Sequence, residues 1–257
     1  MGILDGKNIL VTGVTMNTSI AYKVAEVAEQ QGATVIVTAF GRALRLATKV
    51  VQKLDPVPQV IELDASNADE LAALPGKLRE LGFDHVDGVL HSIAFANPER
   101  ALGGAFLKTG WDDVAVSLHT STYSYVSLAM AVRELMSAGS SVVGLTFDAS
   151  VSWPSYDWMG VAKAGLESAN RYLARYLGPD QISSNLVAAG PIDSIAKTAI
   201  PGANSFNDIW TERAPLGWDA KDATPVANAV CALFSDLFTA TTGEIIHVDG
   251  GLASTGA

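Results

Sequence analysis

The chain has one cysteine, no long apolar run and no excess of positive charge. Its 257 residues include 17 lysines and arginines against 27 aspartates and glutamates, which gives a net charge of −10. This acidic balance argues against a nucleic-acid surface and against general binding to anionic membranes. No stretch reaches the roughly 18 apolar residues of a membrane-spanning helix. We therefore expect no membrane insertion and no nucleic-acid partner.

Further absences concern cysteine, histidine clusters and targeting signals. A single cysteine, Cys231, excludes a disulfide within the chain, and its place in VANAVCALFSD predicts a packed core thiol. The four histidines are scattered, so we expect no metal site. The N-terminal MGILDGKNILVTG lacks a charged region followed by a long apolar run, so no secretory signal is predicted. Together these features favour a cytoplasmic protein.

Apolar, strand-like runs alternate with helix-length amphipathic stretches along the chain. Strands are predicted at 8–13, 34–39, 59–64, 87–94, 141–147, 183–190 and 243–251. Helices are predicted at 19–32, 43–54, 67–81 with a break at Pro75–Gly76, 111–136, 156–177 and 224–236. The alternation predicts an α/β fold, with one domain over 1–257 and a Rossmann-like, doubly wound sheet of about seven parallel strands. Ligands of such sheets bind beyond the carboxyl ends of the strands.

Tyr156 and Lys163 are seven residues apart, which is two turns of a helix, so they project from nearly the same face. The phenol can donate a hydrogen bond to an oxygen that becomes anionic. The ammonium can hold a ribose and keep the local field positive. The same pair also occurs by chance on many amphipathic helices, and it gains weight only from its position in the chain.

The turn after the first strand, from Gly13 to Ser19, leads into a helix whose N-terminus could bind a pyrophosphate. The usual glycine spacing is absent, because Ser19 and Ala21 occupy the later glycine positions. Ser19 can cap the helix and can also donate its hydroxyl to a phosphate. An ordinary capped helix explains the same residues equally well.

The next strand ends carry weaker candidates. No acid follows the second strand, where enzymes that bind NAD often have one, and Phe40 could lie along the adenosine. Arg42 and Arg45 could meet a 2′-phosphate, although a solvated helix face is the simpler interpretation. Asp64 could accept a hydrogen bond from the adenine amino group or cap the following turn. His91 is interpreted as a structural histidine.

These residues resemble the short-chain dehydrogenase/reductase superfamily and, within it, the enoyl-acyl-carrier-protein reductases. The likeness covers nearly the whole chain and is greatest to the mycobacterial NADH-dependent branch that isoniazid targets. It is carried by ILDGKNILVTG with SIA at 19–21, LHSIAF at 90–95, Tyr156-x6-Lys163 in YDWMGVAKAGLESANR, SNLVAAGPI at 184–192, RAPLGWDAKDATPVANAVCALFSD at 213–236 and ATTGEIIHVDGG at 240–251. The resemblance implies NADH-dependent reduction of trans-2-enoyl thioesters, linked to acyl carrier protein or CoA, in type II fatty acid biosynthesis by a homotetramer.

The resemblance also implies roles for individual residues. The catalytic residues would be Tyr156, Lys163 and Phe147, the last packing beside the nicotinamide, although core packing explains Phe147 equally well. The dinucleotide would be lined by Gly13, Ser19, Ile20, Phe40, Asp64, Ala65, Ser92, Ile93, Ala94, Lys163, Ile192 and Ser194. The acyl substrate would be contacted by Phe95, Tyr156, Met159 and Trp218.

The chain departs from the mycobacterial branch in the substrate-binding loop and near the cofactor. The loop segment, at about 193–218, is visibly shorter before RAP-x-GW, which puts very long acyl chains in doubt. Ala94 stands where the relatives have glycine, and Gly41 where they have aspartate. Gly41 thus removes a charge that would oppose a 2′-phosphate, so NADP is not excluded, although the resemblance implies NADH.

Two other functions remain open at this stage. A carbonyl reductase of the 3-oxoacyl or simple alcohol type usually has Tyr-x3-Lys, with a serine about a dozen residues upstream of the tyrosine. Here Gly160 stands four residues after Tyr156, and the upstream positions hold Val143 and Gly144. A non-catalytic dinucleotide sensor would bind the cofactor without turnover, and the intact tyrosine–lysine pair argues against it.

Two surface features concern partners. The stretch 120–132, TSTYSYVSLAMAV, carries many small and apolar residues, as a helix covered by a partner subunit would, although burial inside one subunit explains it too. An acidic acyl carrier would need a local basic patch on this acidic protein. The candidate residues are Lys197, Arg213 and Lys221, and a solvated surface is the simpler interpretation of each.

Overall fold

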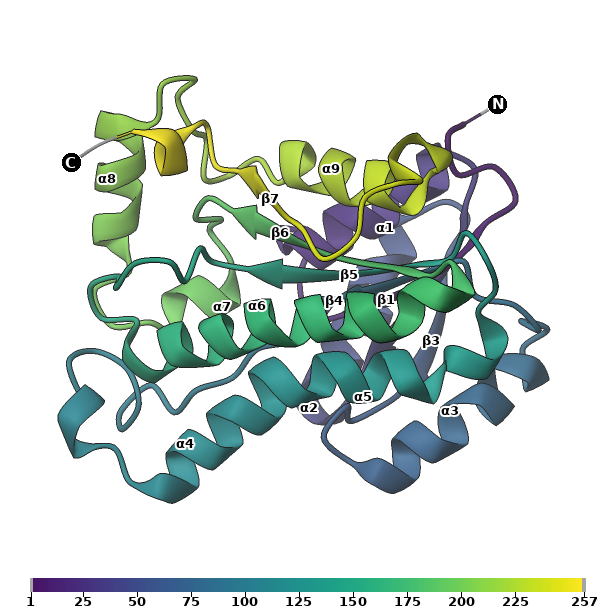
Figure 1. The fold of residues 1–257 in the computed structure, drawn as a ribbon, viewed down its shortest axis with the longest axis horizontal. Coiled ribbons are helices and arrows are strands. Elements are labelled where there is room, and N and C mark those ends of the chain that lie inside the picture. Colours follow the sequence, from purple (N-terminus) through teal and green to yellow (C-terminus); the bar gives the residue numbers. More distant parts are fainter. Residues whose placement is uncertain (1, 256–257) are drawn as a thin grey trace.

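The computed structural model describes residues 2–255, which are built around a seven-stranded sheet (Figure 1). Its strands are β1 (Asn8–Thr12), β2 (Thr34–Ala39), β3 (Gln59–Glu62), β4 (Gly88–His91), β5 (Ser141–Thr146), β6 (Ser183–Ala189) and β7 (Ile245–Val248). All neighbours pair in parallel, in the order β3-β2-β1-β4-β5-β6-β7. The predicted α/β fold with a doubly wound, Rossmann-like sheet is confirmed.

Helices cover both faces of the sheet (Figure 1). They are α1 (Ile20–Gln30), α2 (Gly41–Val50), α3 (Ala68–Glu80), α4 (Trp111–Leu118), α5 (Ser124–Ala131), α6 (Asp157–Leu177), α7 (Ile195–Thr198), α8 (Asn204–Arg213) and α9 (Thr224–Phe234). Alternate residues of β1 point to opposite faces, so Ile9 and Val11 pack under α1, α2 and α9, while Leu10 packs under α3, α5 and α6. Burial on both faces explains why the strands are continuous apolar runs. Within residues 2–255, no helix is long and apolar enough to cross a membrane.

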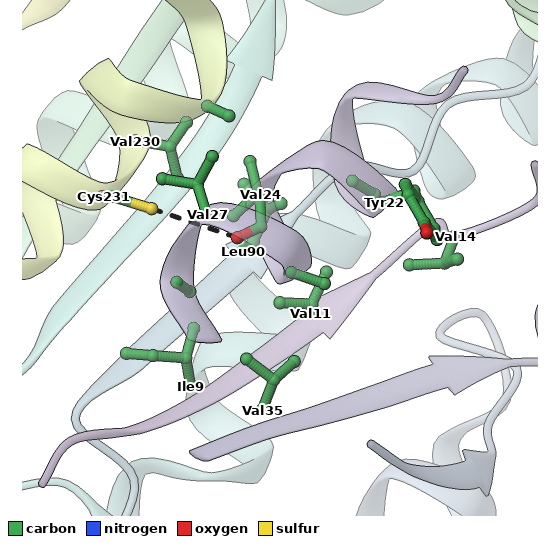
Figure 2. Close-up of a cluster of buried hydrophobic side chains, with 14 of the residues drawn as sticks. Ile9, Val11, Val14, Tyr22, Val24, Val27, Val35, Leu90, Val230 and Cys231 are labelled. Carbon is green, nitrogen blue, oxygen red and sulfur yellow. Dashed lines mark hydrogen bonds between the residues drawn. The ribbon is translucent and has the colours of Figure 1, made fainter. Parts of the chain in front are cut away.

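The core under α1 and α9 contains the single cysteine (Figure 2). Val11 of β1 packs with Val24 of α1 and Val230 of α9, and the Cys231 thiol points to the Val24 carbonyl oxygen at 4.0 Å. Burial raises the pKa of this thiol to about 12. The predicted core thiol is confirmed.

The predicted break at Pro75–Gly76 is wrong, because α3 runs through it. A proline inside a helix costs about 3 kcal/mol, since one backbone hydrogen bond is lost and the ring crowds the preceding turn. Leu71, Leu74 and Leu78 of the same helix are all buried in the core. Each buried leucine contributes about 1.5–3 kcal/mol, so together they outweigh the cost of the proline.

The predicted helix over 111–136 is interrupted by a π-helical turn, His119–Tyr123, between α4 and α5. The wide turn directs two hydroxyls toward the end of β4. Ser121 Oγ accepts from the Phe95 N–H at 2.9 Å and lies 3.1 Å from the Phe95 carbonyl oxygen, while Ser124 Oγ lies 2.7 Å from His91 Nε2. Single π-helical turns occur frequently at functional sites, and this one supports the strand end predicted to lie beside the cofactor.

Candidate active site

Tyr156 and Lys163 lie at the start of α6, beside the carboxyl end of β5, and both side chains are buried. The Lys163 ammonium donates a hydrogen bond to the Leu145 carbonyl oxygen at 2.8 Å. Burial lowers the pKa of Lys163 to about 8, and the nearby Glu167 charge opposes this shift. Burial raises the pKa of Tyr156, so its hydroxyl is protonated at neutral pH.

The Tyr156 hydroxyl forms no hydrogen bond with any residue between 2 and 255. The unused O–H of this buried phenol can donate to an incoming oxygen acceptor, because no hydrogen bond within the protein has to be broken first. Lys163 uses one of its three N–H groups on Leu145, which leaves two for a ligand. Tyr156 therefore provides the phenol donor, and Lys163 the ammonium donor, that the sequence predicts.

An aromatic cluster surrounds Phe147, which directly follows β5. The centroid of its ring lies 5.0 Å from Trp153, 5.2 Å from Tyr156, 5.4 Å from Phe206 and 5.6 Å from Trp210. Phe206 and Trp210 come from α8 and are 2% exposed. The sequence motifs did not predict Trp153, Phe206 and Trp210. The spacing of Phe206 and Trp210, four residues apart in SFNDIW, would have placed them on one helix face had this segment been interpreted as helical.

Trp210 also borders a small cavity of about 10 Å³, close to the volume that one water needs. Its indole Nε1 is buried without a hydrogen-bond partner among the described residues. A buried donor of this kind is unfavourable unless something else satisfies it. The cavity and the unused donor lie on the α8 side of Phe147, where the predicted substrate-binding segment folds.

The predicted substrate residues are only partly brought together. Tyr156 and Met159 share an apolar cluster that Phe147 borders. Trp218 packs at the end of β6, and its Nε1 donates to the Pro191 carbonyl oxygen at 2.8 Å. Phe95 is 48% exposed after β4.

The turn between β1 and α1 fits a bound dinucleotide. Gly13 has φ +84°, and a Cβ there would lie 2.0 Å from the Ser92 carbonyl oxygen, so only glycine allows β1 and β4 to approach this closely. The N-terminus of α1 opens at the same edge, and Ile20 is its first residue. Ser19 caps this helix as predicted, accepting from the Tyr22 N–H at 3.2 Å. Its hydroxyl is already used on the Met16 carbonyl oxygen at 2.8 Å, so a phosphate would have to displace that bond.

The segment after β4 is held in place by polar contacts from β1. Thr12 Oγ1 accepts from the Ser92 N–H at 3.0 Å and donates to the Leu90 carbonyl oxygen at 2.8 Å. Ile93 and Ala94 follow, with Ala94 exposed. The preceding His91 is fully buried, and burial lowers its pKa to about 3, so it is neutral in the physiological range.

Other predicted cofactor residues lie at the outer strands. Phe40 follows β2 and is 49% exposed. The Asp64 carboxylate accepts from both the N–H and the hydroxyl of Ser66, at 2.9 and 2.6 Å, so the turn-cap interpretation is confirmed. Ala65 beside it is buried, and Arg42 and Arg45 are exposed on α2.

The segment at 193–218 folds into two helices, α7 and α8, instead of an irregular loop (Figure 1). Ser194 caps α7 by accepting from the Lys197 N–H at 3.3 Å, and Ile192 before it is buried. Lys197 is itself buried, pairing with the Asp193 carboxylate and donating to Asn207 Oδ1 at 2.6 Å. Both sequence interpretations of Lys197, as basic patch and as solvated surface, are therefore wrong.

Comparison with known proteins identifies the group to which these features belong. A family described as enoyl-(acyl carrier protein) reductase matches residues 13–253. Proteins named enoyl-[acyl-carrier-protein] reductase [NADH] from Mycolicibacterium smegmatis and Mycobacterium avium are each 44% identical, over 99% of this chain and 98% of the relative. A protein from Staphylococcus aureus named enoyl-[acyl-carrier-protein] reductase [NADPH] FabI is 35% identical, over 96% of this chain and 97% of its own length.

Proposed function

Because this chain belongs to the enoyl-(acyl carrier protein) reductase family, we propose that it reduces trans-2-enoyl thioesters to saturated acyl thioesters with NADH in fatty acid synthesis. The acyl group would be carried by an acyl carrier protein or by CoA. The observation that carries the proposal is the buried Tyr156 and Lys163 pair beside the carboxyl end of β5. In a parallel sheet, this is the edge at which ligands bind.

NADH, when bound, supplies the hydride that adds to the β-carbon of the enoyl thioester. Tyr156 would donate a hydrogen bond from its unused O–H to the thioester oxygen, which gains negative charge as the hydride adds; the resulting enolate then takes a proton from water at its α-carbon to give the saturated thioester. A donor at such an oxygen contributes roughly 3–4 kcal/mol to transition-state stabilisation. Lys163 would hold the ribose of the cofactor with N–H groups not used on Leu145, and its charge would keep the field around Tyr156 positive.

The cofactor would lie across the ends of β1, β4 and β6. Gly13 and Ser92 form the close approach over which the pyrophosphate would pass. Ile192 and Ser194 would contact the nicotinamide end. Of the three relatives described above, two are named for NADH and one for NADPH. We favour NADH, and the exposed Arg42 and Arg45 keep NADPH as the second candidate.

The segment at 193–218 would form the wall of the acyl site through Phe206 and Trp210. Both side chains pack against Phe147, whose ring lies beside Tyr156. An acyl chain that reaches Tyr156 must displace part of this aromatic cluster. Short and medium acyl groups require the smallest displacement, so we propose these as the preferred substrates.

We also propose that the chain assembles as a homotetramer, as the resemblance implies. Large apolar side chains are exposed along α5 and α6, which lie side by side (Figure 1). They are Met130, Val161, Tyr172 and Tyr176. Contact with further copies would remove them from water. A cytoplasmic location stays a prediction from the sequence.

The test is oxidation of NADH, and separately of NADPH, with trans-2-octenoyl-CoA and with the matching 3-oxoacyl thioester as control. We expect turnover of the enoyl substrate alone. Turnover of only the 3-oxoacyl compound would instead make the protein a carbonyl reductase. Cofactor binding without turnover of either substrate would favour a dinucleotide sensor.

A further inference from the structure

Glu167 is a buried carboxylate one helical turn after Lys163 on α6. Its Oε1 accepts from the Thr146 hydroxyl at 2.9 Å and from the Ala149 N–H at 3.0 Å. Lys163 donates to the carbonyl oxygen of Leu145, the residue immediately before Thr146. Two side chains on one face of α6 therefore hold the chain as it leaves β5.

Phe147 lies between the two residues that Glu167 contacts. The neighbouring Asp148 is held as well, because its Oδ2 lies 3.1 Å from His247 Nε2 of β7 and its carbonyl oxygen accepts from Trp153 Nε1 at 2.7 Å. The turn at 145–149 is thus fixed from α6, from β7 and from the loop that follows. The aromatic side chain of this turn, Phe147, packs against the Tyr156 ring.

Burying a carboxylate is unfavourable unless hydrogen bonds and an opposite charge compensate. Glu167 has two hydrogen bonds, and the opposite charge available to it on α6 is Lys163. An apolar side chain at this position could pack against β5 without the cost of burying a charge. The charge and the hydrogen bonds are therefore best explained by what they do to Lys163 and Phe147.

We propose that Glu167 is a positioning residue for the reaction at Tyr156: its hydrogen bonds fix the turn that carries Phe147, and its carboxylate places a negative charge one helical turn from Lys163. This inference rests on the proposed function. The carboxylate acts through its neighbours and need not touch substrate or cofactor. It has two separable effects, one of hydrogen bonding and one of charge.

The charge effect depends on the groups that face Lys163. Burial lowers the pKa of Lys163 to about 8, and Glu167 raises it. His91 faces Lys163 from β4 but is neutral, because burial lowers its pKa to about 3. Tyr156 is also neutral, since burial raises its pKa. Removing the Glu167 charge should therefore lower the pKa of Lys163 further, toward neutral pH.

Three variants separate the two effects. Glu167→Gln keeps an oxygen acceptor for Thr146 and Ala149 but removes the charge. Glu167→Ala removes both, and Thr146→Val removes one hydrogen bond alone. The matched control is Asp87→Asn, because Asp87 Oδ2 accepts from the Asn8 N–H at 2.8 Å at the opposite, amino-terminal edge of the sheet.

The experiment measures kcat, KM, NADH affinity and thermal stability of the full chain across neutral and alkaline pH. NADH affinity and kcat/KM should both fall at alkaline pH, and for Glu167→Gln we expect this fall to begin at a lower pH than in the parent. At pH values below the fall, kcat of this variant should be nearly that of the parent. For Glu167→Ala, kcat should fall about tenfold to a hundredfold, because Phe147 and Tyr156 lose their alignment. Thr146→Val should show a smaller fall, and Asp87→Asn should change stability only.

The inference is overturned if Glu167→Gln leaves both pH profiles unchanged, or if Glu167→Ala retains the parent kcat at saturating NADH. Should Glu167→Ala fail to fold, Glu167→Gln and Thr146→Val still decide the outcome. A parent chain that binds NADH but does not reduce the enoyl thioester would refute the proposed function alone. In that case, the pH dependence of NADH affinity still tests Glu167, and a parent that binds no NADH would refute both proposals.

Discussion

At the scale of single residues, burial decides which side chains can carry charge or donate protons. Tyr156 and Lys163 are both buried, yet the phenol stays protonated and the lysine loses its charge only near its lowered pKa of about 8. Their spacing predicted that they share a helix face; in the structure Tyr156 is the N-cap residue before α6, and Lys163 lies within the helix. The sequence did not predict Glu167, because its partners Thr146 and Ala149 reach it only through the fold.

Tyr156→Phe should lower kcat/KM for an enoyl thioester by roughly a hundredfold to a thousandfold, because the donor to the developing oxyanion is lost. Its melting temperature should match the parent, since the hydroxyl has no hydrogen-bond partner among residues 2–255. Steady-state NADH oxidation and a thermal melt measure the two quantities. A variant with parental activity would show that Tyr156 is not the donor.

Glu29 should make the stability of the protein pH-dependent. Burial, with the charges of Asp55 and Glu26, raises its pKa from 4.5 to about 7. The protonated form is therefore favoured by folding, and its contribution is complete below pH 4.5 and lost as the pH rises through about 7.

Glu29→Gln should consequently be more stable than the parent above pH 7 and equally stable near pH 4.5. Because the side chain is only partly buried, solvent screening reduces the gain to about 1 kcal/mol. This corresponds to about 3 °C in a thermal melt. An unchanged difference between parent and variant across this pH range would contradict the prediction.

At the scale of elements, α8 supplies two of the aromatic side chains that pack against Phe147. Phe206 and Trp210 fill the space beside Phe147. Trp210→Ala should shift the preference toward longer acyl chains, because removing the indole opens that space. The ratio of kcat/KM for a long and a short enoyl thioester measures this shift.

The same variant should lose about 3–5 kcal/mol of stability, since a buried tryptophan is removed. Trp111→Ala is the matched control, because Trp111 is 72% exposed at the start of α4. It should change neither chain-length preference nor stability by much. Equal chain-length profiles for Trp210→Ala and the parent would show that α8 does not bound the acyl site.

The elements that the sequence failed to predict share a physical cause. Apolar runs were sufficient to predict the seven strands, because the five inner strands β1, β2, β4, β5 and β6 are buried almost throughout. Pro75 suggested a break in α3, and tertiary burial of the leucines around it overrode that local signal. The π-helical turn between α4 and α5 has no local signature either, since its hydroxyls bond to the distant Phe95 and His91.

At the scale of the whole molecule, the proposed assembly depends on the exposed face of α6. Tyr172 and Tyr176 are 63% and 73% exposed on α6. If copies associate through this face, the double variant Tyr172→Glu, Tyr176→Glu should dissociate the tetramer, because buried like charges oppose contact. Light scattering after size-exclusion chromatography measures the mass.

Leu107→Glu provides the control, since Leu107 is 93% exposed in the loop before α4 and belongs to neither α5 nor α6. It should leave the tetramer intact. A parent that elutes with the mass of one chain would contradict the assembly proposal. The enzymatic proposal would stand, because Tyr156, Lys163 and Phe147 all come from one chain.

Because the single cysteine, Cys231, is buried, the native protein has no surface thiol that would react readily with a maleimide. With its pKa raised to about 12, the native cysteine presents almost no thiolate near neutral pH. A single cysteine introduced on the outer side of α8, as in Glu212→Cys, could therefore be labelled selectively in the otherwise unaltered protein. A dye or spin probe attached there would report directly on how α8 moves when an acyl thioester enters.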